Sequence, residues 1–175
     1  VGLANGNFVV AYIDNYMLPN FTHIKRVKAQ LFDPTGVKIG SSFYVDDIVG
    51  TPTYKLTERP PSISATADGG FIIAWGQTNE APDITYIGSS RWQQFSGGGT
   101  KIGVVGRDLI GNVHEWKVDS SILQDGQFVT IESLGNDGLD ADLFIRSVDM
   151  AHASVLWDNS PSQTVSLYAR YSTLE

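Results

Sequence analysis

The chain has 175 residues, 42% hydrophobic and 18% charged, a balance typical of a globular domain rather than a disordered chain. It contains no cysteine, which excludes disulfides, thiol nucleophiles and zinc–thiolate sites. A net charge of −7 at pH 7 argues against nucleic acid as a partner, because phosphate binding needs a basic face. No apolar run of about 18 residues is present, so we predict no membrane span.

The chain begins at Val1, without an initiator methionine, and enters an apolar run within a few residues, so we expect a fragment of a larger protein. Residues 8–13 and residues 71–75 each follow a pair typical of a tight turn, Asn-Gly or Asp-Gly, and are apolar at nearly every position. A strand with two apolar faces is buried on both of them. We therefore predict a sheet between two other layers, with Tyr12 in the core.

The next segments also predict strands. Residues 27–32 alternate in polarity, and the Asp-Pro-Thr-Gly turn after them leads into a third strand at 38–45. Residues 61–65 predict a short strand, and residues 113–118 another alternating one. No segment keeps an apolar period of about 3.6 residues, so we expect almost no helix.

An internal repeat is the most informative pattern. Residues 4–12 (Ala-Asn-Gly-Asn-Phe-Val-Val-Ala-Tyr) recur 63 residues later as residues 67–75 (Ala-Asp-Gly-Gly-Phe-Ile-Ile-Ala-Trp). The same offset aligns a Gln-x-Phe segment that begins at Gln30 with one that begins at Gln93. A third copy begins at Asp125, but its next recognisable segment is only the Tyr-Ala-Arg-Tyr of residues 168–171.

Four strands in each repeat of about 60 residues are typical of β-propeller blades. We predict an all-β fold of four-stranded antiparallel units that resembles a β-propeller, with a β-sandwich as the alternative. We assign one domain, 1–175, with three repeats at about 1–60, 61–120 and 121–175. Three blades leave edge strands unpaired, so we expect residues 165–171 to pair with residues 8–13 of the same chain, or of a second chain in a homodimer.

Two segments resemble a known repeat. Residues 61–75 are similar to the Pro-Ser-hydrophobic … Asp-Gly-Gly-Phe-Val-Val-x-Trp repeats of large bacterial secreted and surface proteins. These proteins include haemolysin-type calcium-binding proteins and giant adhesins. Residues 28–40 resemble the following strand of that repeat, Tyr-Ala-Gln-x-Phe-Asp-x-x-Gly-x-x-x-Gly. The resemblance implies an extracellular or bacterial cell-surface location and brings no catalytic motif.

Two tryptophans predict a ligand site. Trp92 and Trp116 lie on alternating strands, and polar and charged residues flank them: Arg91, Gln93, His114 and Glu115. An exposed indole beside such groups is typical of sites that stack on a sugar ring. We predict glycan or another cell-surface ligand here. The alternative is that both indoles cover sheet faces in the core.

A carboxylate cluster predicts a second kind of site. Asp137, Asp140 and Asp142 could supply oxygen ligands to calcium, and we expect no other cofactor. The alternative is a solvated hairpin turn.

These observations favour a non-catalytic extracellular module for binding or adhesion. Two alternatives stay open: a structural spacer repeat and a polysaccharide hydrolase. Hydrolysis of a glycosidic bond needs two carboxyl groups about 5–9 Å apart, and no pattern in the sequence pairs them.

Overall fold

The computed structural model describes residues 1–17, 23–46, 55–58, 60–80, 87–112, 115–122, 128–136, 140–149 and 154–158. These residues form twelve strands in three antiparallel sheets, and the described part of the chain contains no helix. The prediction of an all-β fold is therefore confirmed. Within the same ranges, no helix is long and apolar enough to cross a membrane. The propeller-like closure and the repeat boundaries stay predictions.

Sheet 1 contains β1 (Phe8–Met17), β2 (His23–Phe32) and β3 (Lys38–Tyr44), in that spatial order. One edge of β1 pairs with β2 along its whole length. The other edge binds the start of the chain, because the Val1 amino group donates to the Val9 carbonyl and the Val9 N–H donates to the Val1 carbonyl. The predicted partner of that edge, residues 165–171, lies outside the described residues.

Sheet 2 has the spatial order β4-β6-β7-β8, with β5 also paired to β6. Its strands are β4 (Lys55–Glu58), β5 (Ser62–Ala65), β6 (Phe71–Glu80), β7 (Ile87–Phe95) and β8 (Lys101–Asn112). The short strands β4 and β5 pair with successive halves of β6. Of these two strands, the sequence predicted β5 but not β4, because residues 55–58 carry no turn signal or alternation that distinguishes them.

Sheet 3 has the order β12-β11-β10-β9. Its strands are β9 (Glu115–Ile122), β10 (Phe128–Asn136), β11 (Asp140–Asp149) and β12 (Ser154–Asp158). In the third copy, the sequence pointed to residues 168–171 for the second recognisable segment. Residues 168–171 lie outside the described residues, and the strand that follows β10 in the described part of the chain is β11, which pairs with it antiparallel.

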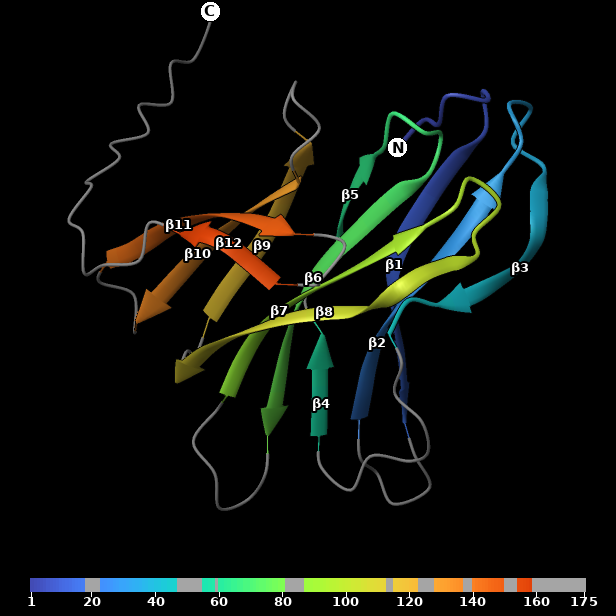
Figure 1. The fold of residues 1–175 in the computed structure, drawn as a ribbon. Helices are drawn as coiled ribbons and strands as arrows, with labels where there is room; N and C mark the ends of the chain where they lie inside the picture. The colour runs from blue at the N-terminus through green and yellow to red at the C-terminus, as the bar shows by residue number, and fades with distance from the viewer. Residues whose placement is uncertain are drawn as a thin grey trace, which may run out of the picture.

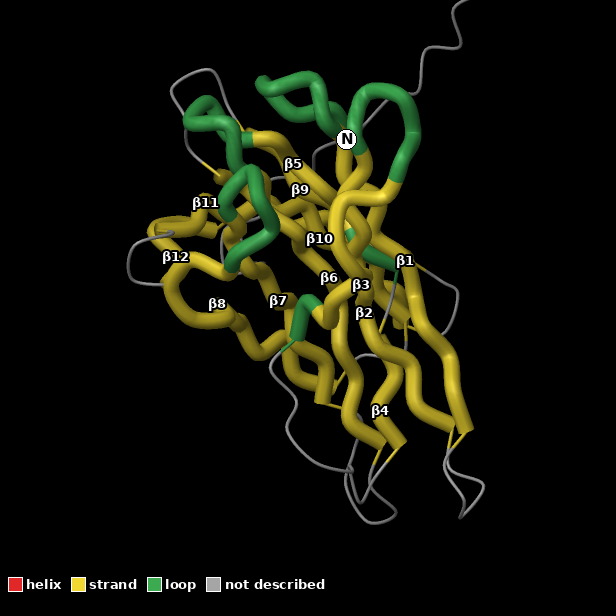
Figure 2. The backbone as a smooth tube through the Cα atoms, turned by 90° about the vertical axis from the view of Figure 1, so that its right-hand side faces the viewer, coloured by secondary structure: helices red, strands yellow, loops and turns green. Residues whose placement is uncertain are grey.

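Sheet 2 lies between sheets 1 and 3 (Figure 1). In the view turned by 90°, β1, β2 and β3 of sheet 1 lie to the right of β8, β11 and β12 (Figure 2). Ser120 of β9 joins sheet 3 to sheet 2, because its backbone N–H and its hydroxyl both bond to the Ser62 hydroxyl.

Sheets 1 and 2 share local geometry at an offset of 63 residues. Gly36 and Gly99 have positive φ angles of 88° and 84° in matching hairpin turns. In each turn the glycine N–H donates to the carbonyl three residues earlier, that of Asp33 or Ser96. Positive φ costs a residue with a side chain about 1–2 kcal/mol, so glycine at these positions fixes the same turn in both sheets.

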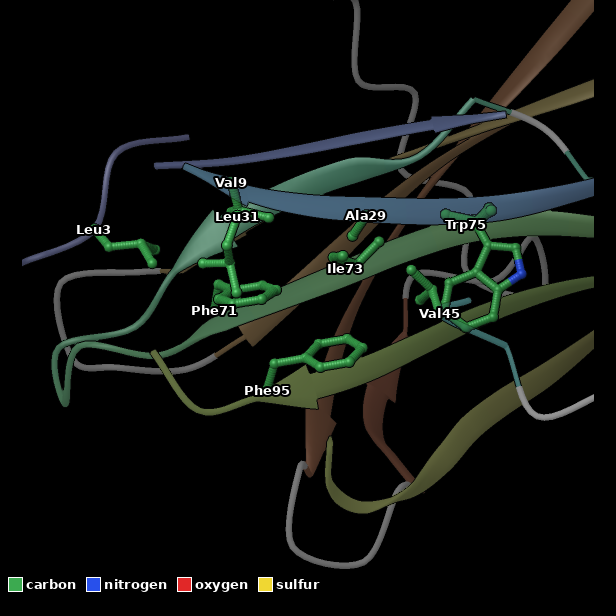
Figure 3. Packing of buried hydrophobic residues seen from close by; sticks show 10 residues of the cluster. Leu3, Val9, Ala29, Leu31, Val45, Phe71, Ile73, Trp75 and Phe95 are labelled. Carbon is green, nitrogen blue, oxygen red and sulfur yellow. The ribbon is translucent and has the colours of Figure 1, made fainter. Parts of the chain in front are cut away.

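The main core lies between sheets 1 and 2. The inner face of sheet 1 consists of Val9, Ala11, Ile13, Val27, Ala29, Leu31, Phe43 and Val45. It packs on the face of sheet 2 that carries Phe71, Ile73, Trp75 and Phe95 (Figure 3). Burial of these apolar and aromatic groups drives the stacking of the two sheets.

The prediction of two buried faces is right for β6 and wrong for β1. Every residue from 71 to 77 is buried, so β6 is covered on both faces. In β1, Val9 is buried but Val10 and Tyr12 are 43% and 40% exposed. Tyr12 therefore lies outside the core, because sheet 1 is the end of the described stack and has no sheet on its second face.

Candidate functional site

The outer face of sheet 1 is the candidate site. Strand alternation and cross-strand register place these residues on it: Phe8, Val10, Tyr12, Asp14, Arg26, Lys28, Gln30, Phe32 and Tyr44. One half of the face, around Phe8, is apolar, and the other half, around Tyr44, is charged and aromatic. Val10 and Tyr12 lie between the two halves and are its most exposed apolar side chains.

The apolar half is held rigidly. The rings of Phe8 and Phe32 stack at a centroid distance of 5.0 Å, with only 7° between their planes. Beside them, the Gln30 side-chain amide donates to the carbonyls of Leu31 (2.8 Å) and Ile39 (3.2 Å). Gln30 occupies the irregular point in the pairing of β2 with β3, where the ladder leaves carbonyls to be satisfied by a side chain.

The charged half is built around Tyr44. The Tyr44 hydroxyl donates to an Asp14 carboxylate oxygen (3.1 Å), and Lys28 Nζ lies 2.9 Å from the same oxygen. Two cations also lie over the tyrosine ring, with Arg26 Cζ at 3.9 Å and Lys28 Nζ at 4.6 Å from its centroid. Because cations already cover the Tyr44 ring, the exposed ring of Tyr12, between the two halves, is one that a ligand could stack on.

A buried ion pair joins this half to the rest of the molecule. Arg26 donates to both carboxylate oxygens of Asp46, with its Nε at 3.0 Å from Oδ2. Lys101 of sheet 2 donates from Nζ to the Asp46 backbone carbonyl at 2.7 Å. A two-pronged arginine–carboxylate pair has a fixed geometry, so Arg26 is held in place over the Tyr44 ring.

Hydrogen bonds and partial burial in the Tyr44 half favour an ionised Asp14, a protonated Lys28 and a protonated Tyr44 hydroxyl. The hydrogen bond from Lys28 lowers the pKa of Asp14 below its ordinary value, and the same bond raises the pKa of Lys28. Partial burial raises the pKa of Tyr44, and its hydrogen bond to Asp14 adds to the rise. At neutral pH the face therefore presents a protonated phenol and matched opposite charges.

The tryptophan site of the sequence analysis is only partly described. Trp92 is 1% exposed, and Gln93 is buried with its amide bonded to the carbonyls of Gln94 (2.9 Å) and Ile102 (2.8 Å). The burial of Trp92 favours the core interpretation, because a sugar ring cannot reach its indole. Arg91 is half-buried on the opposite face of β7 from Trp92.

The remaining predicted site residues fall on less well described parts. Glu115 and Trp116 lie on β9, where the structure describes their backbone but not their side chains. His114 lies outside the described residues. For the predicted calcium site, Asp140 and Asp142 lie on β11, opposite Asn136 and Leu134, again without described side chains. Asp137 lies outside. No group of three His, Cys, Asp or Glu side chains in the described ranges could hold a metal.

The outer face of sheet 1 is not predicted by the sequence patterns. They place Tyr12 in the core and indicate no role for Asp14, Lys28 or Tyr44. A signal was present, since Asp14 interrupts the apolar run of β1 at a position on the same face as Tyr12. The pairing of Asp14 with Lys28 and Tyr44, however, depends on the register of three strands.

Comparison of the chain with protein-family models, with curated proteins and with solved structures found no match.

Proposed function

We propose that the chain is a non-catalytic binding module and that its binding surface is the outer face of sheet 1. The observation that carries this proposal is the exposure of Val10 and Tyr12 in the middle of a paired, hydrogen-bonded sheet. Apolar side chains at the centre of a rigid face, with charged groups at one side, are typical of interaction surfaces.

The described carboxylates with known contacts support a non-catalytic role. Asp14 and Asp46 are in ion pairs, whereas Asp33 and Asp68 accept hydrogen bonds within tight turns. Hydrogen bonds within the turns, chiefly from the Thr35 and Thr66 hydroxyls, lower the pKa of Asp33 and Asp68. Carboxylates held ionised in this way are poor general acids at neutral pH.

Adhesion and an extracellular or bacterial surface location remain proposals that follow from the sequence resemblance, and a glycan ligand remains a proposal that follows from the two tryptophans. The burial of Trp92 removes one of the two indoles on which we based the glycan site. Tyr12, next to Lys28 in the cross-strand register, offers the same combination of an aromatic ring and a polar group.

A structural spacer is the second candidate function. It is favoured by the matching hydrogen bonds of Gln30 and Gln93 and by the matching turns of sheets 1 and 2. A repeat array in a large protein needs only that each sheet stacks on the next.

The test compares the chain with a Tyr12→Glu variant on a glycan array and by analytical ultracentrifugation. A Val37→Glu variant is the control, because Val37 is an exposed apolar residue in a turn and not on the outer face. A ligand that Tyr12→Glu loses and Val37→Glu keeps would support the proposed function. A ligand bound equally by both variants would contradict it, and a chain that neither binds nor self-associates would favour the spacer.

Calcium binding at Asp137, Asp140 and Asp142 is tested by thermal melting. A calcium ion that binds only the folded state raises the melting temperature, by mass action. Melting curves that coincide in millimolar calcium and in EDTA would contradict the site.

A further inference from the structure

The outer face of sheet 1 has a counterpart in sheet 2 that is fully covered. At the offset of 63 residues, Phe8, Val10 and Tyr12 correspond to Phe71, Ile73 and Trp75. The cross-strand partners correspond as well, since Phe8 faces Phe32 and Phe71 faces Phe95. The two faces are therefore equivalent in position and similar in chemistry.

In sheet 2 this face is the one that another sheet covers. Phe71, Ile73 and Trp75 are 0% exposed because the inner face of sheet 1 packs on them (Figure 3). The same kind of face in sheet 1 leaves Val10 and Tyr12 exposed. The sequence carries the same signal, because residues 8–13 have the apolar character of a strand that is buried on both faces.

Charge on the outer face favours a second copy of this chain as the covering partner. The whole chain has a net charge of −7, so two copies repel each other over most of their surface. On the outer face, however, Asp14 pairs with Lys28 and Asp46 pairs with Arg26. These carboxylates are neutralised locally, so two copies can approach through this face.

The arrangement of the stack selects which surface of the second copy takes part. The inner face of its sheet 1 is already occupied by sheet 2. On the face of sheet 3 that corresponds to it, the structure describes Val129, and that side chain is only 4% exposed. Among the sheet faces that the structure describes, the outer face of sheet 1 is the one on which two neighbouring apolar side chains, Val10 and Tyr12, are exposed, and a twofold axis would bring it against its own copy.

Resting on the proposed function, we propose that the outer face of sheet 1 is a homodimer interface. Two copies stack face to face through Val10 and Tyr12, with the Phe8–Phe32 and Tyr44 halves around them. This contact differs from the edge-strand pairing predicted from the sequence, since it uses side chains on a sheet face and leaves the edges free.

Sedimentation of the full chain across a concentration series tests the interface. We expect a monomer–dimer equilibrium whose dissociation constant rises at least about 100-fold in Tyr12→Glu, because the twofold axis places the buried charge in the contact twice. Val10→Lys should have the same effect with the opposite charge. Val37→Glu should leave the dimer intact, and Tyr12→Trp, which copies the residue of sheet 2, should preserve it.

Far-UV circular dichroism of each variant establishes that it folds. If Tyr12→Glu does not fold, Val10→Lys takes its place in the sedimentation experiment. A chain that is monomeric at every concentration would overturn the interface. A chain that stays monomeric but binds a glycan through Tyr12 would also overturn the interface, but it would leave the proposed function in place. A dimer that survives both substitutions would also overturn it and would place the contact at an edge strand.

Discussion

Phe71 and Phe8 hold equivalent positions in their strands, but only Phe71 is enclosed by two sheets. Phe71 is fully buried and stacks on Phe95 at a centroid distance of 5.0 Å. We expect Phe71→Ala to lower the free energy of unfolding by about 3–5 kcal/mol, as deletion of a buried aromatic ring does. Urea denaturation followed by tryptophan fluorescence measures the change.

Phe8→Ala is the matched control. Phe8 also stacks on a phenylalanine, Phe32, but it is only half-buried on the outer face. The loss should therefore be clearly smaller than for Phe71→Ala, because less apolar area leaves water on folding. Equal losses would mean that the outer face of sheet 1 is as enclosed as its counterpart in sheet 2.

Asp14 makes stability depend on pH at the residue scale. Its folded-state pKa lies below the ordinary 3.8, chiefly because of the hydrogen bond from Lys28. Its ionised form therefore stabilises the fold above about pH 3.8, and this contribution is lost as the pH falls through the folded-state pKa. We expect the chain to melt at a higher temperature than Asp14→Asn at pH 7, and the gap to shrink below pH 3.8.

The control for that comparison is Asp33→Asn, which removes a carboxylate of lowered pKa in a turn without touching the Tyr44 half. If added salt narrows the neutral-pH gap for Asp14→Asn, the ion pair with Lys28 is its source. A gap for Asp14→Asn that stays constant from pH 7 to pH 2 would contradict the assignment.

At the scale of the elements, the hairpin turn between β7 and β8 fixes how closely sheets 1 and 2 approach. A Cβ on Gly99 would lie 2.7 Å from Leu31 Cδ1 and 3.3 Å from Phe43 Cε1, both on the inner face of sheet 1. A Cβ on Gly36, in the matching turn of sheet 1, would meet nothing within 4 Å.

We expect Gly99→Ala to destabilise the chain by at least about 1 kcal/mol more than Gly36→Ala, because it adds overpacking to the strain of positive φ that both share. Chemical denaturation of the two variants gives the difference directly. Identical midpoints would show that the turn does not determine the distance between the sheets.

At the scale of the whole molecule, the backbone amides at the centre of the stack of sheets should be the best protected from hydrogen exchange. β6 pairs along both of its edges and is buried on both faces from residue 71 to residue 77. We expect its amides to exchange most slowly of all described strands and those of β1 to exchange faster, since exposure of one face lowers the cost of local opening. Hydrogen exchange followed by mass spectrometry resolves the two strands, and equal rates would contradict this arrangement.

Several elements could be predicted from the sequence because their signals are local. Turn glycines such as Gly36 and Gly99 mark the hairpins, and the apolar runs after Gly6 and Gly69 mark β1 and β6. The candidate site could not be predicted in the same way. Asp14, Lys28 and Tyr44 come from three different strands, and nothing in the sequence shows that their side chains meet.

The sequence by itself determined the all-β class of the described residues, where several of their strands begin and which residues turn the hairpins, because alternation, apolar runs and glycine act over a few residues. Only the tertiary structure decided which faces are covered. Tyr12 and Trp75 occupy matching positions in matching apolar runs, yet Trp75 is buried under sheet 1 and Tyr12 is exposed. Burial depends on which sheet lies opposite, and strand order within the stack sets that neighbour over distances that no local pattern spans.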